Sequence, residues 1–268
     1  MSSNSTLGRA LITGASSGIG ATYAQRLAAQ GYDLLLVARD QARLGQLAER
    51  LHGEFGVDVA VLPADLTRRE DRARVEARLA RDADISLLLN NAGVAINGTL
   101  VDTDLDRLES MIELNVIAVA RLAGAAAKAF SARGRGTIIN VASVLALAPE
   151  LFNGSYSGTK AFVLNLSLSM QQELAASGVR VQAVLPGATR TEIWDRSGAG
   201  IEHLPEAMLM EVGHMVDAAL AGLAQGEAVT IPALPEAADF QAYTQARQKL
   251  GPNLSLRLPA ERYGVQLG

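Results

Sequence analysis

The sequence contains no cysteine, which excludes disulfides, thiolate metal sites and a thiol nucleophile. Aromatic residues make up only 4% of the 268 residues, so alanine, leucine and valine must fill the core. The net charge of −4 gives no basic field that would favour nucleic acid. The three histidines are scattered, and we predict no metal site.

Long apolar runs are missing too. No window of 18 consecutive apolar residues occurs, which argues against a membrane-spanning helix. The first residues lack the charged region and apolar stretch of a signal peptide. We therefore expect a cytoplasmic protein without a membrane partner.

Hydrophobic residues make up 49% of the chain, enough for a large core, and many of them fall into runs of strand length. These runs lie at residues 9–13, 33–38, 57–62, 85–90, 136–142, 179–185 and 228–231. Each of the first six is followed by a stretch with helical character, which predicts βαβ units and a parallel sheet. Because the runs are almost continuously apolar, both faces of the sheet should be covered by helices.

The spacing of these elements predicts a single domain over 1–268. Its core would span 8–232, and residues 232–268 would form a C-terminal tail. Residues 188–227 interrupt the strand–helix rhythm and contain the single tryptophan, Trp194. We interpret this segment as an insertion that helps to form the substrate site.

In an open parallel sheet, ligands bind at the carboxyl ends of the strands, and unusual residues follow each predicted strand. After the first, Gly14, Gly18 and Gly20 open a helix. Glycines there allow a diphosphate to approach the helix N-terminus, although tight strand–helix packing alone would also require them. Ser16, Ser17 and Ile19 belong to the same turn.

The second and third strand ends offer charged side chains. Arg39 favours the 2′-phosphate of NADP, whereas Asp40 is a competing candidate that would bind the ribose of NAD. Asp65, followed by Leu66, could accept the adenine amino group or form part of a helix cap.

The remaining strand ends carry amides, hydroxyls and turn residues. They are Asn91, Ala92 and Gly93 after the fourth strand, Ser143 after the fifth, and Pro186, Gly187, Thr189 and Thr191 after the sixth. Each group has an alternative interpretation as an ordinary turn or cap. Thirteen residues after Ser143 stands Tyr156, and Lys160 follows four residues later on the same helix face.

Together, TGASSGIG, NNAG, Asn115 in ELNV, Ser143, YSGTK and PGATRT resemble the short-chain dehydrogenase/reductase family over about residues 8–232. The resemblance implies a Rossmann-type doubly wound, three-layer α/β sandwich with a seven-stranded parallel sheet. It also implies an NAD(P)-dependent oxidoreductase that interconverts a hydroxyl and a carbonyl group, assembled as a homodimer or homotetramer. Its catalytic set would be Asn115, Ser143, Tyr156 and Lys160.

The family's chemistry gives each of these residues a role. Tyr156 would be the acid or base, and Lys160 would lower its pKa and contact the nicotinamide ribose. Ser143 would orient the substrate, and Asn115 would support a proton-relaying water. The substrate would be small and moderately hydrophobic, contacted by Leu145, Phe152 and Trp194 as well as Ser143 and Tyr156.

Two other functions are compatible with this fold. One is a cofactor-binding regulator or scaffold without turnover, which the presence of both Tyr156 and Lys160 argues against. The other is an epimerase or dehydratase of the broader superfamily, which the modest length of the chain argues against.

Overall fold

The computed structural model describes residues 5–194, 200–201 and 204–265. The chain divides into two compact units, Met1–Pro232 and Ala233–Gly268. A single domain over 1–268 with a tail from 232 stays a prediction. The second unit contains α9 (Ala237–Gln248) and two short 3-10 turns, and none of these elements has a buried residue.

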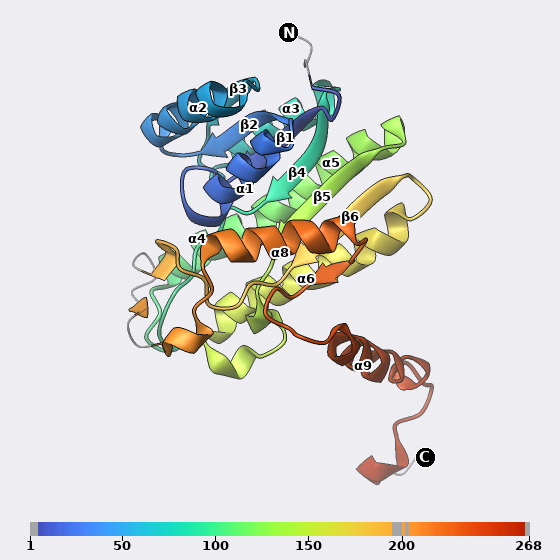
Figure 1. The fold of residues 1–268 in the computed structure, drawn as a ribbon. Helices are drawn as coiled ribbons and strands as arrows, with labels where there is room; N and C mark the ends of the chain where they lie inside the picture. The colour runs from blue at the N-terminus through green and yellow to red at the C-terminus, as the bar shows by residue number, and fades with distance from the viewer. Residues whose placement is uncertain (1–4, 195–199, 202–203, 266–268) are drawn as a thin grey trace. The chain divides into compact units, whose positions relative to one another are not determined.

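The first unit is built on a seven-stranded sheet in the order β3-β2-β1-β4-β5-β6-β7, with every pair of neighbouring strands parallel (Figure 1). The strands are β1 (Arg9–Thr13), β2 (Asp33–Ala38), β3 (Val59–Pro63), β4 (Ile85–Asn90), β5 (Gly136–Val141), β6 (Val179–Val184) and β7 (Val229–Thr230). All seven predicted strands are present, and the doubly wound parallel sheet is confirmed. The sequence predicts that the third strand begins at Val57, two residues before β3 begins in the structure. The carbonyl of Val57 forms a hydrogen bond of 2.9 Å with the His52 ring and not with a neighbouring strand.

Helices cover both faces of this sheet, as Figure 1 shows. Those of the first unit are α1 (Gly18–Ala29), α2 (Gln41–Phe55), α3 (Arg69–Arg81), α4 (Leu105–Ile112), α5 (Val119–Arg133), α6 (Gly154–Leu174) and α8 (Val212–Ala224). Side chains of α1, α2 and α8 share one buried cluster with Ile12 and Leu36. Those of α3, α5 and α6 share another with Leu11 and Leu35. Successive strand residues therefore enter opposite layers, which explains why the strand sequences are apolar throughout.

The segment 188–227 is not one continuous insertion. Residues 212–224 form α8, and Met215, Val216 and Ala219 are buried in the same core cluster as α1. The helix is thus the crossover between β6 and β7, and only residues 188–211 depart from the strand–helix rhythm. The apolar spacing of α8 was available in the sequence, but the irregular segment before it masked the boundary.

A longer helical stretch runs through Leu105–Arg133 and is long and apolar enough, by length and composition alone, to cross a membrane. It comprises α4, a π-helical segment η1 (Glu113–Ala118) and α5. Leu122, Ala126 and Phe130 of α5 are buried against the sheet. This placement is that of the core helix of a globular domain.

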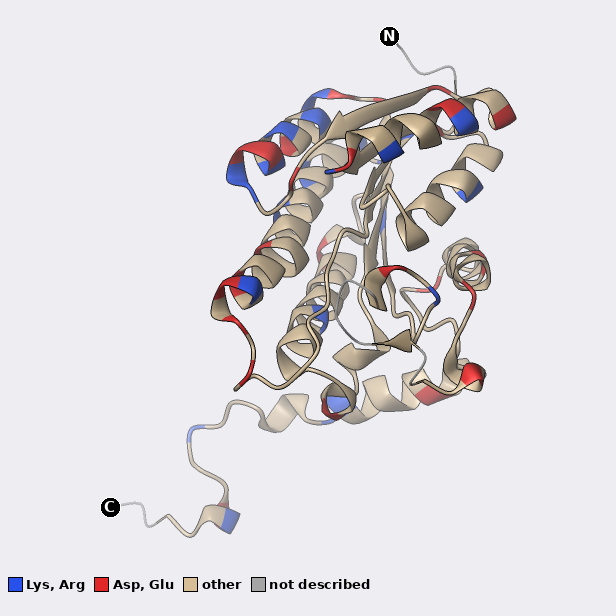
Figure 2. Ribbon diagram, turned by 90° about the vertical axis from the view of Figure 1, so that its left-hand side faces the viewer, with Lys and Arg blue, Asp and Glu red and all other residues tan. Residues whose placement is uncertain are grey.

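Charged residues of both signs are interspersed along the helices of the ribbon (Figure 2). Arg9 is the most deeply buried of the paired cations, with a side chain only 6% exposed. It donates to Asp58 at 2.8 Å and to Asp82 at 3.1 Å, and so ties β1 to the segments before β3 and β4 at the amino end of the sheet. Asp82 also accepts from Arg78; these partners outweigh its partial burial and hold the pKa of Asp82 below its usual value.

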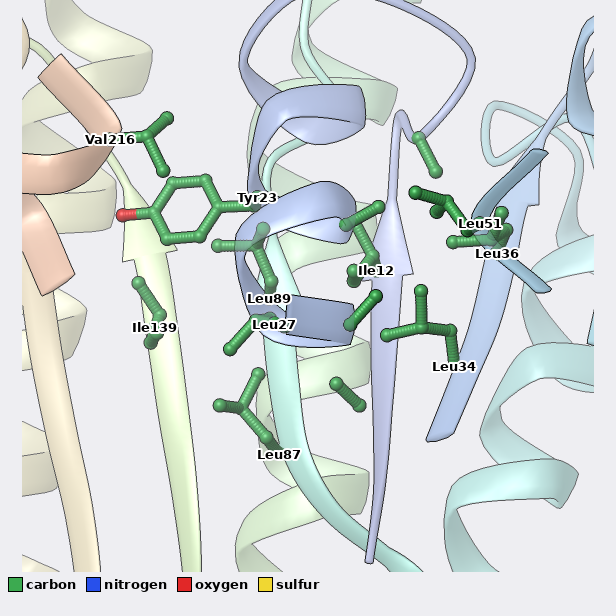
Figure 3. Packing of buried hydrophobic residues seen from close by; sticks show 14 of the residues in the cluster. Ile12, Tyr23, Leu27, Leu34, Leu36, Leu51, Leu87, Leu89, Ile139 and Val216 are labelled. Carbon is green, nitrogen blue, oxygen red and sulfur yellow. The ribbon is translucent and has the colours of Figure 1, made fainter. Parts of the chain in front are cut away.

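Tyr23 is the largest fully buried side chain of α1. In Figure 3 its ring fills the space between α1, the sheet and α8, and the hydroxyl lies beside Val216 and Ile139. Among the described residues the hydroxyl has no hydrogen-bond partner, and burial raises the pKa of Tyr23. A buried hydroxyl without a partner costs stability, whereas the ring beneath it contributes to packing.

We expect Tyr23→Phe to leave the free energy of unfolding unchanged or to raise it by about 1 kcal/mol, because the substitution removes only the unpaired hydroxyl. The fully buried neighbour Leu27 provides the control, since Leu27→Ala should lower stability by about 2–5 kcal/mol. Urea unfolding followed by circular dichroism measures both. A loss above about 1 kcal/mol in Tyr23→Phe would show that the hydroxyl is bonded in solution.

Candidate active site

A cleft of about 1050 Å³ lies at the carboxyl ends of the strands. It includes the point where the order of the sheet turns from β1 to β4, the usual ligand position in this architecture. The predicted residues that line it are Gly14, Ser16, Ser17, Gly18, Ile19, Arg39, Asp65, Leu66, Asn91, Ala92, Gly93, Ser143, Leu145, Phe152, Tyr156, Lys160, Pro186, Gly187, Thr189, Thr191 and Trp194. Gly20 and Asn115 are not among the lining residues.

The glycine-rich turn between β1 and α1 meets both requirements considered from the sequence. A Cβ on Gly20 would collide with the carbonyl oxygen of Gly14, so Gly20 serves close packing. Gly14 has φ +65°, and a Cβ there would lie 2.7 Å from the side-chain nitrogen of Asn91. Asn91 in turn donates to the carbonyl oxygens of Thr13 and Gly14 at 2.9 and 3.2 Å. These contacts hold the turn flat against β4.

This turn leaves room for a phosphate group at the start of α1. Gly18, φ +53°, and Ile19 form the first turn of α1 and line the cleft. Ser17 occupies the N-cap position but makes no side-chain capping bond. The backbone N–H groups of a helix start are donors for anions. The arrangement therefore fits a dinucleotide diphosphate.

The two charged residues after β2 have separate tasks. Asp40 is the N-cap of α2, and its carboxylate accepts a hydrogen bond from the backbone N–H of Arg43 at 3.0 Å. Arg39 is exposed and lines the cleft. Asp40 lines the cleft as well, and its capping bond engages only one carboxylate oxygen, so both residues stay candidates for a cofactor contact.

Asp65 does not take the predicted cap position of the following helix, and its contact with the adenine amino group stays a prediction. It lines the cleft, and one of its carboxylate oxygens accepts from the backbone N–H and the hydroxyl of Thr67, at 3.0 and 2.7 Å. The helix that follows begins at Arg69, with Arg68 at its N-cap. Asp65 therefore shapes the turn before α3 while it faces the cleft.

Asn115 lies in the π-helical segment η1, a feature that the sequence does not predict. The residue is 1% exposed. Its side-chain oxygen accepts a hydrogen bond from the backbone N–H of Val94 at 3.0 Å, and its side-chain nitrogen donates to the carbonyl of Val94 at 2.9 Å. It also donates to the hydroxyl of Thr159 at 3.1 Å. Asn115 thus joins the loop after β4 to the residue before Lys160. π-Helical turns occur frequently at functional sites.

Tyr156 sits in the first turn of α6, where the chain is fixed from several directions. Asn153 caps the helix by accepting from the backbone N–H groups of Ser155 and Tyr156, at 2.9 and 3.0 Å. The Asn153 amide also donates to the carbonyl of Gly98 at 2.6 Å. The ring of Phe152 packs edge-on against Tyr156 with centroids 5.8 Å apart. The tyrosine ring is therefore held in one orientation at the cleft wall.

Lys160 lies one helical turn beyond Tyr156, as its spacing predicts. Its ammonium group donates to the carbonyl of Val141 at 3.0 Å and lies 5.7 Å from the centre of the Tyr156 ring. Both side chains are buried. Burial lowers the pKa of Lys160 to about 8, because the charged form loses its hydration.

The predicted lowering of the tyrosine pKa is wrong for this structure. Burial raises the pKa of Tyr156 to about 12, and the hydrogen bond with Ser143 only partly opposes this rise. Desolvation disfavours the phenolate, and it outweighs the hydrogen bond. At neutral pH Tyr156 therefore carries its proton.

Ser143 lies at the end of β5 on the same side of the cleft. Its hydroxyl accepts from the backbone N–H of Leu145 at 3.2 Å and lies 3.5 Å from the carbonyl of Pro186. Because Ser143 also bonds Tyr156, the two hydroxyl groups form one polar spot in an otherwise apolar wall.

The apolar wall contains the predicted substrate contacts Leu145, Phe152 and Trp194. The indole N–H of Trp194 donates to the carbonyl of Thr189 at 2.8 Å, which fixes the ring near the base of the 188–211 segment. A bridge pairs Thr189 with Met210 and brings the ends of this segment together. The lining residues Leu151 and Met208 are 69% and 59% exposed, so the apolar wall is open to solvent on one side.

Sequence reasoning missed Arg43 and Glu192, which also line the cleft and bind each other across it. Arg43 follows Arg39 by four residues, but Arg39 precedes the Asp40 N-cap of α2, so no shared helix face connects the two arginines. No local signal connects either residue to the other, because 149 positions separate them.

Comparison with known proteins also indicates an oxidoreductase. Residues 9–202 match the family model described as short chain dehydrogenase. An uncharacterised oxidoreductase of Staphylococcus saprophyticus is 32% identical over 185 residues, which cover 69% of this chain and 79% of that protein. The chain belongs to the short-chain dehydrogenase/reductase family and is an oxidoreductase that acts on CH–OH groups.

Two solved structures are similar over nearly the whole chain. A short-chain dehydrogenase from Sphingobium yanoikuyae in complex with NADPH is 52% identical, with TM-score 0.93, covering 96% of this chain and 100% of that one. A bulky-bulky ketone specific alcohol dehydrogenase from Comamonas testosteroni is 46% identical, with TM-score 0.88, covering 96% and 98%.

The depressed pKa of Lys160 predicts a pH-dependent contribution to stability. In the folded protein this pKa is about 8, below the usual 10.5, so the unfolded chain binds more protons between these values. Stability should therefore rise with pH in that window. The difference in the free energy of unfolding between wild type and Lys160→Met should therefore change in favour of wild type by roughly 2–3 kcal/mol from pH 7 to pH 10.

Urea unfolding of the protein without added cofactor, at several pH values, measures this difference. The exposed Lys128 gives a matched control, since Lys128→Met should leave a pH-independent difference from wild type. Parallel stability curves for wild type and Lys160→Met would contradict the prediction.

Proposed function

We propose that the protein is an NADP(H)-dependent reductase that interconverts a carbonyl and a hydroxyl group. The observation that carries this proposal is the convergence of Ser143, Tyr156 and Lys160 at one wall of the cleft that the glycine-rich turn and Arg39 also line. The NADPH complex of the Sphingobium relative supports the cofactor assignment.

Residues from several strand ends would hold the dinucleotide. The turn at Gly14 and Gly18 would take the diphosphate, Arg39 the 2′-phosphate, and Asp65 the adenine. Asn91, Gly93 and the turn from Pro186 to Thr191 would flank the nicotinamide half. When bound, the reduced nicotinamide supplies a hydride.

Tyr156 acts as the proton donor to the substrate oxygen. Its pKa of about 12 keeps the phenol protonated at neutral pH, as a donor in carbonyl reduction requires. The Ser143 hydroxyl, bonded to the same phenol, donates to the substrate oxygen and orients it.

Lys160 returns a proton to Tyr156 after each turnover. With a pKa of about 8 it both releases and accepts protons near neutral pH, whereas an ordinary lysine would hold its proton. Asn115 acts as a positioning residue, since its bonds to Val94 and Thr159 hold the two segments that flank the Lys160 ammonium.

The substrate we propose is a ketone with apolar groups on both sides of the carbonyl. Leu145, Phe152 and Trp194 offer apolar surface, and the open side at Leu151 and Met208 admits a second large group. The Comamonas relative, named for bulky-bulky ketones, supports this extension of the smaller substrate expected from the sequence. Assembly as a homodimer or homotetramer and a cytoplasmic location stay predictions.

Tyr156→Phe should lower the rate of NADPH-dependent ketone reduction by about 100-fold or more, because it removes the proton donor while keeping the ring. Steady-state assays with a panel of aryl ketones measure the rate, and titration calorimetry should show nearly unchanged NADPH binding. Full activity in the variant would overturn the role of Tyr156. Wild-type protein that binds NADPH but reduces no carbonyl would favour a regulator without turnover.

Arg39→Asp should shift the ratio of NADP(H) to NAD(H) affinity toward NAD(H) by about 10- to 100-fold, since a charged contact with the phosphate is replaced by repulsion. The two dissociation constants, measured by calorimetry, give the ratio directly. Arg50→Gln, at an exposed arginine of α2 outside the cleft lining, controls for the loss of positive charge. An unchanged ratio would refute the role of Arg39.

A further inference from the structure

A second arginine stands beside Arg39 at the adenosine end of the cleft. Arg43 lies one turn further along the chain, in the first turn of α2, and also lines the cleft. Its side chain is 48% exposed, so it can meet a ligand from solvent. The two guanidinium groups together could take a phosphate that carries about two negative charges at neutral pH.

Arg43 is at present occupied by carboxylates. Its Nη1 donates to both oxygens of Glu192, at 3.1 and 3.0 Å, and its Nε lies 3.5 Å from Asp40. Arg39, by contrast, forms no ion pair within the part of the chain that the structure describes. The carboxylate of Glu192 thus already binds the Arg43 guanidinium, to which a phosphate could otherwise bind.

The pair between Arg43 and Glu192 reaches from one side of the cleft to the other. Glu192 follows Thr191, whose side chain would lie 3.2 Å from a Cβ on Gly18 at the start of α1. Arg43 belongs to the helix after β2, whereas Glu192 belongs to the segment after β6. The ion pair therefore links the two walls beside the glycine-rich turn.

This pair is suited to being exchanged. Both side chains are about half exposed, and exposed ion pairs of this kind contribute little to stability. A phosphate dianion offers a guanidinium stronger charge-assisted bonds than a carboxylate does, and it repels a carboxylate beside it. Binding of a 2′-phosphate would thus displace Glu192 from Arg43.

We infer that Arg43 is a second specificity-determining residue for the 2′-phosphate and that Glu192 is its built-in competitor, which the phosphate displaces. The inference rests on the proposed use of NADP(H). It also connects cofactor recognition to the substrate wall, because Glu192 lies two residues from Trp194 in the segment that forms this wall.

Two small probes isolate the 2′-phosphate. Adenosine 2′,5′-bisphosphate and 5′-AMP differ only in this group, and calorimetry on the full chain gives both dissociation constants. Arg43→Gln should weaken binding of the bisphosphate about tenfold and change 5′-AMP binding less than about twofold. Glu192→Gln should strengthen bisphosphate binding by about two- to fivefold and leave 5′-AMP unchanged.

The double variant tests that Glu192 acts through Arg43. In the absence of Arg43, Glu192→Gln should have no further effect on bisphosphate binding, so the two single effects are not additive. Arg50→Gln, with its partner Glu54 on the outside of α2, is the matched control and should leave both constants unchanged.

Each other outcome overturns part of the inference. Equal losses for both probes in Arg43→Gln would make Arg43 a structural residue. Weaker bisphosphate binding in Glu192→Gln would show that Glu192 supports Arg43 instead of competing with the phosphate. If wild type prefers the bisphosphate but Arg43→Gln keeps this preference, only the inference fails. If wild type shows no preference, the NADP(H) assignment fails with it.

Discussion

Because all seven strands of the sheet run parallel, their carboxyl ends meet at one edge, and the functional features of the molecule depend on this constraint. Residues 14, 39, 91, 143 and 187 are far apart in the chain, yet the strand order β3-β2-β1-β4-β5-β6-β7 places all of them around one cleft. The turns there are free to carry polar groups because the helices bury the apolar residues of every strand on both faces of the sheet. The close fit of Gly14 and Gly20 against each other and Asn91 then fixes where the cleft begins.

Burial is the force that adjusts the chemistry within this cleft. It raises the pKa of Tyr156 to about 12 and lowers that of Lys160 to about 8, so two values that lie close together in water move apart. Each shift disfavours a charge, the phenolate in one case and the ammonium in the other. At neutral pH the phenol consequently holds its proton, whereas the ammonium releases its proton more readily than it would in water. The burial also costs stability, because a charged lysine is held away from solvent.

Much of the site followed from patterns along the chain. Strand ends, the four-residue spacing of Tyr156 and Lys160, and the glycine turn are local features, and each led to the correct wall of the cleft. The sequence misled where burial or distant contacts decide the outcome. The tyrosine pKa was predicted in the wrong direction, since spacing reveals a nearby lysine but not the loss of water around it. Likewise, nothing in the sequence shows that Asp40 caps α2 while it lines the cleft beside Arg39.

The sequence by itself determined the family and the seven strands and predicts the reacting side chains, because these are encoded in hydrophobic periodicity and short motifs. Tertiary structure alone decided three further properties. It placed Asn115 in a π-helical turn between Val94 and Thr159, it raised the pKa of Tyr156 by burial, and it joined Arg43 to Glu192 across 149 positions. Each of these depends on which distant segments pack together and on how much water they exclude, and neither quantity is written in any local stretch of residues.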